Sequence, residues 1–248
     1  MVSSVVLITG ALTGIGRATA FAFAQEGAYV VVSGREDDVG MELAEELRRL
    51  CGVSHYVHAD VSNEDHVRRL ADETVARFGR LDIAVNNAGV EGKLGFLTEQ
   101  SVESYTLAFN TNVLGTMLCL KHELRLMRAQ GHGSVINISS TLGHKAAPGT
   151  SAYTASKHAV EGLTKVAALE AATYGVRVNA VAPGPTDTQM FDRFAATPER
   201  KDAMTAGVPL KRIATSGEIA QAIVFLASDR AAFMTGHILA VDGGRSAT

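Results

Sequence analysis

The sequence contains little of what marks disulfide-rich, membrane or nucleic-acid-binding proteins. Two cysteines, Cys51 and Cys119, among 248 residues exclude a disulfide framework and favour a reducing compartment, so we expect a cytoplasmic protein. Lys and Arg number 23 and Asp and Glu 26, and the net charge of −3 gives no electrostatic basis for binding nucleic acid or an anionic membrane. Apolar runs stay far below the roughly 20 residues of a membrane helix. Residues 1–4 carry no basic charge, so we expect no secretory signal.

Linker sequences are also lacking. All five prolines lie beyond residue 147, and no stretch rich in Pro, Gly and Ser divides the chain. Hydrophobic residues make up 46% and charged residues 20%, which supplies a core and excludes disorder as the main state. A length of 248 residues is ordinary for one α/β domain. We therefore predict a single domain over residues 1–248.

Short apolar runs alternate with longer amphipathic segments along the chain. The runs are rich in Val and Ile and apolar on both faces, as strands buried in a parallel sheet are. The alternation predicts a doubly wound, seven-stranded parallel sheet with helices on both faces. The predicted strands cover residues 5–9, 29–33, 55–59, 83–86, 134–138, 177–181 and 238–241, and the predicted helices cover residues 15–25, 36–50, 64–78, 102–129, 154–174 and 216–227.

Residues 186–209 break this alternation, because they form too long a connection between a strand and a helix. The segment carries the apolar side chains of Met190, Phe191 and Phe194. We predict that it forms a lid over a substrate pocket, with a pair of packed surface helices as the alternative.

A glycine-rich loop follows the first predicted strand and precedes a predicted helix. Gly10, Gly14 and Gly16 are spaced as G-x-x-x-G-x-G, which differs from the common dinucleotide pattern. Glycines at such a place let backbone N–H groups approach a pyrophosphate at a helix N-terminus. The loop alone is a weak signal, since a tight strand–helix turn has the same composition. Its position favours nucleotide binding.

The residues at the end of the second predicted strand are the ones expected to bind a ribose. An acidic residue there binds a ribose 2′-hydroxyl, and a cation favours a 2′-phosphate. The strand ends with Ser33 and Arg35 and has no acid at its tip. A guanidinium pairs well with phosphate, so NADP(H) is favoured. NAD(H) stays possible because Thr13 stands where a second cation would strengthen the case.

Tyr153 and Lys157 stand four residues apart in a predicted helix, which places them on one face, and Ser140 follows a predicted strand. Such a trio can move a proton to or from an alcohol or carbonyl oxygen. Lowering a tyrosine pKa from about 10 to about 7 needs roughly 4 kcal/mol. A cation about 4 Å away supplies that at an effective dielectric constant of roughly 20. We expect Lys157 to lower the pKa of Tyr153 and Ser140 to donate a hydrogen bond to the substrate oxygen; a surface pair is the alternative for Tyr-x-x-x-Lys alone.

The full set of motifs resembles the short-chain dehydrogenase/reductase family, in its compact branch of about 250 residues. The resemblance covers nearly the whole chain and implies a Rossmann-type α/β fold and an oxidoreductase. The matching segments are Thr9-Gly10 with Gly14-Ile15-Gly16, Asn86-Asn87-Ala88-Gly89, Asn137-Ile138-Ser139-Ser140, Tyr153 with Lys157, Pro183-Gly184, and Val241-Asp242-Gly243-Gly244.

The resemblance also implies roles for individual residues. Asn112, 28 residues before Ser140, is similar to the fourth catalytic residue of the family, which supports a proton relay beside Lys157. Lys157 and Tyr153 are expected to contact the nucleotide as well. The further nucleotide contacts that the resemblance implies are Gly10, Gly14, Ile15 and Gly16 at the pyrophosphate, Asp60 and Val61 at the adenine, Asn87, Ala88 and Gly89 beside the adenosine, and Pro183, Gly184, Thr186 and Thr188 at the nicotinamide.

We therefore predict an NADP(H)-dependent oxidoreductase that interconverts a carbonyl and a secondary alcohol. The small-molecule substrate is expected to be largely apolar. The candidate pocket residues are Val90, Leu94, His144, Pro185, Met190 and Phe194. The family resemblance also implies a homotetramer, with the helices at 102–129 and 154–174 in the interface.

Several alternatives stay open. An NAD(H)-preferring alcohol dehydrogenase of the same family is one. A 3-oxoacyl-[acyl-carrier-protein] reductase is another, which would need a basic entrance, and Arg125 and Arg128 are its only candidates. A nucleotide-sensing protein without catalysis is disfavoured because all four catalytic residues are present, and a nucleotide-sugar epimerase because no second substrate domain follows. No metal site is predicted, since His55 and His58 project from opposite faces of a strand.

Overall fold

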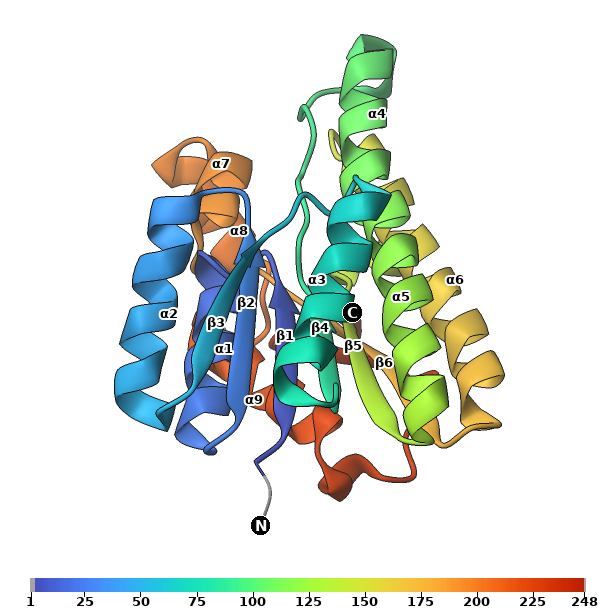
Figure 1. Ribbon diagram of the computed structural model, residues 1–248. Coiled ribbons are helices and arrows are strands. Elements are labelled where there is room, and N and C mark those ends of the chain that lie inside the picture. Colours follow the sequence, from blue (N-terminus) through green and yellow to red (C-terminus); the bar gives the residue numbers. More distant parts are fainter. Residues whose placement is uncertain (1–2, 248) are drawn as a thin grey trace.

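The computed structural model describes residues 3–247 and contains the predicted sheet. Seven parallel strands follow the order β3-β2-β1-β4-β5-β6-β7 (Figure 1), which confirms the Rossmann-type doubly wound topology. The strands are β1 Val5–Thr9, β2 Tyr29–Gly34, β3 Ser54–His58, β4 Ile83–Asn86, β5 Gly133–Ile138, β6 Val176–Pro183 and β7 Ile238–Val241.

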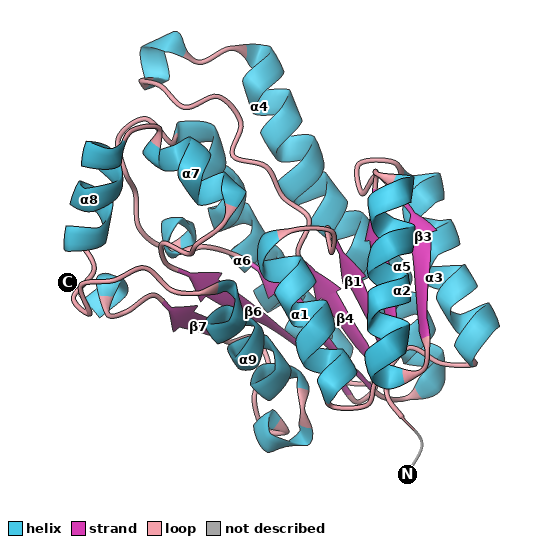
Figure 2. Cartoon of the chain, turned by 90° about the vertical axis from the view of Figure 1, so that its left-hand side faces the viewer, coloured by secondary structure: helices cyan, strands magenta, loops and turns pink. Residues whose placement is uncertain are grey.

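Helices cover both faces of the sheet and form one α/β domain with it (Figures 1 and 2). One apolar core joins α1, α2 and α9 to the sheet, and a second joins α3, α5 and α6 to the opposite face. The helices are α1 Gly14–Gln25, α2 Asp37–Cys51, α3 Glu64–Phe78, α4 Val102–Phe109, α5 Gly115–Gln130, α6 Ser151–Ala172, α7 Gln189–Ala195, α8 Pro198–Ala206 and α9 Ser216–Ala227.

The central strands are buried on both faces, which explains their continuous Val and Ile runs. All five residues of β1 are buried, and Val30, Val31 and Val32 of β2 have no exposed surface. Burying one such side chain contributes roughly 1.5–3 kcal/mol. Thr9 pairs with Asn86, and Asn86 pairs with Asn137, so β1, β4 and β5 end side by side. The polar residues after these strands therefore meet at one edge.

The helix predicted over residues 102–129 is helical throughout in the structure, but its central turn is not α-helical. Between α4 and α5, a π-helical turn spans Asn110–Leu114. The hydroxyl of Thr116 donates to the carbonyl of Asn112 at 2.7 Å, which occupies a carbonyl within the turn. Turns of this kind insert one extra residue into a helix and are frequent at functional sites. Hydrophobic periodicity does not reveal one inserted residue, so the sequence predicted one continuous helix.

The segment 186–209 folds into α7 and α8. Thr188 caps α7, Thr197 caps α8, and Pro198 occupies the first turn of α8. Both helices lie at the end of the molecule toward which the strands run, as α4 does (Figures 1 and 2). In the part of the chain that is described, no helix combines the length and apolar character that crossing a bilayer requires.

Candidate active site

A cavity of about 550 Å³ lies at the carboxyl end of the sheet. Parallel sheets of this type bind ligands at that edge. The predicted residues that line it are Gly10, Thr13, Gly14, Ile15, Arg35, Asp60, Val61, Asn87, Ala88, Gly89, Val90, Ser140, Tyr153, Lys157, Pro183, Gly184, Pro185, Thr186, Thr188, Met190 and Phe194. The predicted residues Gly16, Ser33, Leu94, Asn112 and His144 lie outside its wall.

Glycine shapes the loop between β1 and α1. Gly10 has a φ of +60°, and a Cβ there would lie 2.7 Å from the Cα of Ala88. A Cβ on Gly16 would lie 2.4 Å from the side-chain nitrogen of Asn87, so Gly16 is required by close packing. Thr13 is the N-cap of α1, yet its side chain makes no capping hydrogen bond within the described chain. The first N–H groups of α1 therefore stay uncapped beside the cavity, an arrangement that favours an anion.

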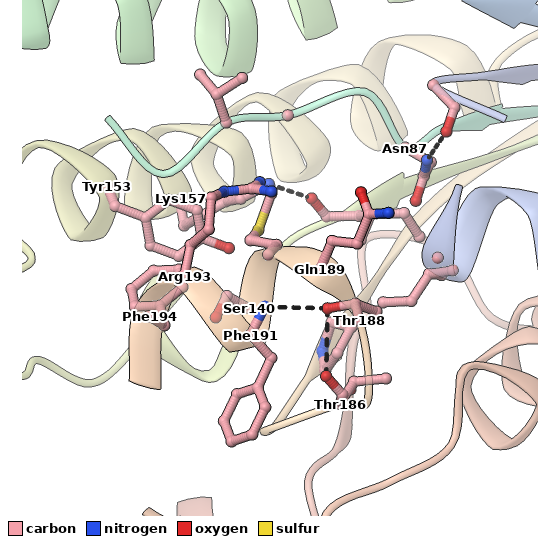
Figure 3. A pocket seen from close by; sticks show the side chains of 18 of the residues that line it. Asn87, Ser140, Tyr153, Lys157, Thr186, Thr188, Gln189, Phe191, Arg193 and Phe194 are labelled. Carbon is pink, nitrogen blue, oxygen red and sulfur yellow. Dashed lines mark hydrogen bonds between the residues drawn. The ribbon is translucent and has the colours of Figure 1, made fainter. Parts of the chain in front are cut away.

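Asn87 fixes this loop to the end of β4. Its Nδ2 donates to the carbonyls of Thr9 at 3.1 Å and Gly10 at 2.8 Å. Its backbone N–H donates to Oγ1 of Thr9 at 3.2 Å. Figure 3 shows Asn87 on the side of the cavity opposite Tyr153 and Lys157. The amide side chain thus holds the glycine loop open instead of facing solvent.

The ends of β2 and β3 place one cation and one carboxylate together. The Nη1 of Arg35 lies 3.9 Å from Oδ2 of Asp60, and 67% of the Arg35 side chain is exposed. Burial would raise the pKa of Asp60, but hydrogen bonds from Ser62 and the charge of Arg35 lower it overall. The hydroxyl of Ser33 is buried and has no hydrogen-bond partner among the described residues. Of the predicted ribose-side pair, Arg35 alone therefore borders the cavity.

Hydroxyl groups order the loop after β6. A Cβ on Gly184 would lie 2.7 Å from the Cα of Asp242, so only glycine fits there. The hydroxyl of Thr186 donates to the Gly184 carbonyl at 2.9 Å, and that of Thr188 donates to the Thr186 carbonyl at 3.2 Å. Thr188 also accepts from the N–H of Phe191, which caps α7 (Figure 3). These bonds join the segment 186–209 to the sheet.

Ser140, Tyr153 and Lys157 come together at one end of the cavity (Figure 3). Tyr153 and Lys157 are buried on one face of α6. The Nζ of Lys157 donates to the carbonyl of Ile138 at 2.8 Å and lies 5.6 Å from the centroid of the Tyr153 ring. The ring of Phe194 meets the Tyr153 ring edge to face, with centroids 5.3 Å apart and an interplanar angle of 72°.

The expectation that Lys157 lowers the pKa of Tyr153 is wrong for the chain by itself. Burial raises the pKa of Tyr153 to about 12, and the hydrogen bond with Ser140 offsets only part of this increase. Burial also lowers the pKa of Lys157 to about 8. The physical reason is desolvation: both groups lose water, and the ammonium is held at a backbone carbonyl instead of the phenol oxygen.

Asn112 lies behind the cavity wall and holds it in shape. Its Nδ2 donates to the Val90 carbonyl and to Oγ of Ser156, at 2.8 and 2.9 Å. Its Oδ1 accepts from the N–H of Val90 at 2.8 Å. The hydroxyl of Ser156 donates in turn to the Tyr153 carbonyl at 2.7 Å. The Asn112 side chain therefore connects the loop after β4 to the helix that carries Tyr153.

The expected substrate-pocket set needs one correction. Val90, Pro185, Met190 and Phe194 line the cavity, but Leu94 and His144 do not. His144 is held elsewhere, because its Nδ1 lies 3.0 Å from Oε1 of the buried Glu161. The spacing from Ser140 suggested a pocket residue, and only the fold shows that the ring turns back onto α6.

Sequence reasoning missed other residues of the wall, and some of them lie on α7 and α8. Arg193 lines the cavity and forms an ion pair with Glu91 across 102 positions of sequence. No local pattern could have connected these two residues. Glu161 is different, since it follows Lys157 by four residues on the same helical face and was within reach of the spacing argument. The additional lining residues on the two helices are Gln189, Phe191, Arg193, Arg200 and Met204.

The donors at the cavity fit a nicotinamide dinucleotide. Uncapped N–H groups of α1 and a glycine loop with no room for side chains suit a pyrophosphate, and Arg35 suits a ribose phosphate. Within the described residues no three His, Cys, Asp or Glu side chains gather as metal ligands would. The imidazole rings of His55 and His58 are paired with different carboxylates, those of Glu73 and Asp37.

Comparison with known proteins agrees with this geometry. A family model described as enoyl-(acyl carrier protein) reductase matches residues 10–246. A cis-4-hydroxycyclohexanecarboxylate dehydrogenase from Sinomonas cyclohexanicum is 42% identical over 246 residues, covering 98% of this chain and 96% of that protein. The crystal structure of levodione reductase superposes with a TM-score of 0.96 at 34% identity, covering 99% of this chain and 98% of that one. A structure of ElxO with NADP bound gives a TM-score of 0.94 at 35% identity and covers 100% of both chains.

The chain therefore belongs to the short-chain dehydrogenase/reductase family, and it is an NAD(P)-dependent alcohol dehydrogenase or ketone reductase of that family.

Proposed function

We propose that the protein is an NADP(H)-dependent oxidoreductase that interconverts a largely apolar secondary alcohol and its ketone. The observation that carries this proposal is the gathering of Ser140, Tyr153 and Lys157 at one end of a cavity whose other walls include the glycine loop and Arg35. Proton-transfer groups and phosphate donors thus share one site. A bound nicotinamide would supply or accept the hydride.

The roles of the chain's own residues follow from their environment. Tyr153 is a neutral phenol at neutral pH, because the ordinary pKa of a tyrosine, about 10, lies well above neutral pH and burial raises it further, so it can donate a proton to a carbonyl oxygen. Ser140 donates a hydrogen bond to the same oxygen as negative charge develops there. Lys157 positions the ribose, and its ammonium favours the phenolate that remains after proton donation. Asn112 holds the loop at Val90 against α6 through its side-chain hydrogen bonds. It lies beside the proton relay that the family resemblance implies.

The preference for NADP(H) rests on Arg35. Its exposed guanidinium borders the cavity, and its nearest carboxylate, on Asp60, lies 3.9 Å away, too far for a hydrogen bond to hold it. A 2′-phosphate would attract it more strongly than a neutral 2′-hydroxyl. ElxO, which was solved with NADP, is similar over its full length. NAD(H) is the alternative cofactor, because Thr13 does not provide a second cation for the 2′-phosphate.

The substrate half of the cavity combines apolar side chains with the polar side chains of Gln189, Arg193 and Arg200. Val90, Pro185, Met190, Phe191 and Phe194 contribute to it, which suits a carbon ring or chain beside the reacting carbonyl. The relative from Sinomonas cyclohexanicum acts on a hydroxycyclohexanecarboxylate, a cyclic secondary alcohol. We infer that a ring-sized alcohol or ketone is the substrate.

A 3-oxoacyl-[acyl-carrier-protein] reductase is the second candidate, because the matching family model is described for acyl-carrier substrates. The cations considered for a carrier entrance are otherwise engaged. Arg125 forms an ion pair with Asp72, and Arg128 lies over the ring of Tyr174. Turnover of a carrier-bound ketone, compared with the free ketone, separates the two functions.

The remaining predictions concern the whole molecule. The segment 186–209 acts as a lid, and the contacts between Arg193 and Glu91 and between Phe194 and Tyr153 hold it over the cavity.

The expected assembly is a homotetramer, and the expected compartment is the cytoplasm. Elution of the purified protein as a stable monomer would contradict the homotetramer.

The experiment that tests the function is a panel of cyclic and linear ketones and secondary alcohols, assayed with both nicotinamides. We expect turnover of ring ketones with NADPH at a higher kcat/KM than with NADH. The absence of turnover with every ketone and both nucleotides would contradict the proposal.

A further inference from the structure

Glu161 is a buried carboxylate that the proposed chemistry leaves unused. It follows Tyr153 and Lys157 on α6 in steps of four residues, so the three side chains share one face of the helix. Only 6% of Glu161 is exposed. A carboxylate is rarely buried to this degree without partners that compensate for lost hydration.

Its partners all belong to one loop. The hydroxyl of Ser139 donates to Oε1 of Glu161 at 2.9 Å. The Nδ1 of His144 lies 3.0 Å from the same oxygen, within hydrogen-bond distance. Gly143 packs directly on the carboxylate, since a Cβ there would lie 2.2 Å from Oε1.

This loop carries Ser140. The N–H of Leu142 donates to Oγ of Ser140 at 3.2 Å, and the N–H of Gly143 donates to the Ser140 carbonyl at 2.8 Å. The loop is therefore a compact turn whose two ends, Ser139 and His144, are joined at one carboxylate oxygen. On the sheet side, the N–H of Ser139 donates to the Val181 carbonyl at 2.8 Å.

We propose that Glu161 is a positioning residue for Ser140. It fastens both ends of the serine loop to the helix that carries Tyr153 and Lys157, and so sets the distance between the serine hydroxyl and the tyrosine hydroxyl. The catalytic consequence rests on the proposed oxidoreductase function. A displacement of about 1 Å in such a group can cost on the order of 100-fold in rate.

The first test is a double-mutant cycle with Ser140, using the best ketone of the panel and NADPH. Glu161→Ala is expected to lower kcat by about 10- to 100-fold, with little change in the KM for NADPH. In a Ser140→Ala background the same substitution should cost less than about twofold, because the group it positions is gone. Glu161→Gln keeps an acceptor for Ser139 and should recover most of the activity. Glu170→Ala, at an exposed position of the same helix, is the matched control.

Equal losses from Glu161→Ala in the two backgrounds would overturn the proposal, because they would mean that Glu161 acts on folding or on another group. So would full activity of Glu161→Ala.

A second measurement does not depend on turnover. Amide hydrogen exchange over residues 139–144 should become at least tenfold faster in Glu161→Ala than in the unaltered protein or in Glu170→Ala, while exchange in β1 and β4 stays the same. Unchanged exchange in this loop would overturn the positioning role. A loop that loosens in a protein that turns over no ketone would instead support the positioning and contradict the proposed function.

Discussion

The two halves of the cavity are built in different ways. The proposed nucleotide half contains the glycine loop, where no Cβ fits at Gly10 or Gly16, the uncapped start of α1, and the ends of β1, β2 and β3. The proposed substrate half is lined by residues of α7, α8 and the loops after β4 and β5. A site formed by main-chain atoms recognises chemical groups that all its ligands have in common. A site formed by side chains can change its specificity by substitution without disturbing the fold.

The proposed catalytic residues, Ser140, Tyr153 and Lys157, line the cavity between these two halves. Tyr153→Phe removes the proton donor and leaves both halves intact, so kcat should fall by about 10²- to 10⁴-fold while NADPH binding stays nearly unchanged. Steady-state kinetics and fluorescence titration with NADPH measure the two quantities. Retained turnover would show that another group transfers the proton.

A substitution in the glycine loop should break the nucleotide half. Gly10→Ala forces a Cβ to within 2.7 Å of the Ala88 backbone at a φ of +60°. We expect a loss of roughly 1–3 kcal/mol in unfolding free energy, and weaker NADPH binding. Gly27→Ala is the matched control, because Gly27 also has positive φ (+80°) and no atom lies within 4 Å of its Cβ position. Equal losses at both positions would mean that backbone strain, and not the close approach, is what Gly10 relieves.

Substitution of Arg35 tests whether the nucleotide half of the cavity distinguishes NADPH from NADH. Arg35→Ala should weaken NADPH binding by about 10- to 100-fold, as the loss of a hydrogen bond between charged groups does, and should leave NADH binding within about twofold. Titration with each nucleotide gives the ratio. An equal effect on both would exclude a contact with the 2′-phosphate.

The pH dependence should differ between the two reaction directions. With the pKa of Tyr153 at about 12, the phenol is protonated at pH 7 and its phenolate fraction rises about tenfold per pH unit. Alcohol oxidation needs the phenolate and should accelerate between pH 7 and 10, while ketone reduction should stay flat. Loss of the Lys157 ammonium above its pKa of about 8 removes a charge that favours phenolate, so the slope should decrease there. Initial rates in both directions test this, and an oxidation rate independent of pH would contradict it.

The smallest effect is expected at the proposed lid, residues 186–209. The ion pair between Arg193 and Glu91 is partly exposed and salt-sensitive, so Arg193→Ala should raise the ketone KM by no more than about fivefold, with kcat within twofold. Lys201→Ala, which removes the exposed pair with Asp192 on the same segment, should change neither constant. If both substitutions act alike, the contact to Glu91 has no particular part in holding the lid.

Most of the architecture could be read from the chain. Val and Ile runs predicted the seven strands because a strand buried on both faces must be apolar throughout. The spacing of Tyr153 and Lys157 placed them together, since a helix brings residues four apart onto one face. These are local rules, and they hold whatever packs around the segment.

The tertiary structure alone decided the rest. It placed a π-helical turn at Asn110–Leu114 within the predicted long helix, turned His144 away from the cavity onto Glu161, and left Tyr153 with a raised pKa in place of the expected lowered one. It also paired Arg193 with Glu91, 102 positions away. Desolvation, ring orientation and ion pairing depend on which distant segments enclose a group, and no local pattern of residues contains that information.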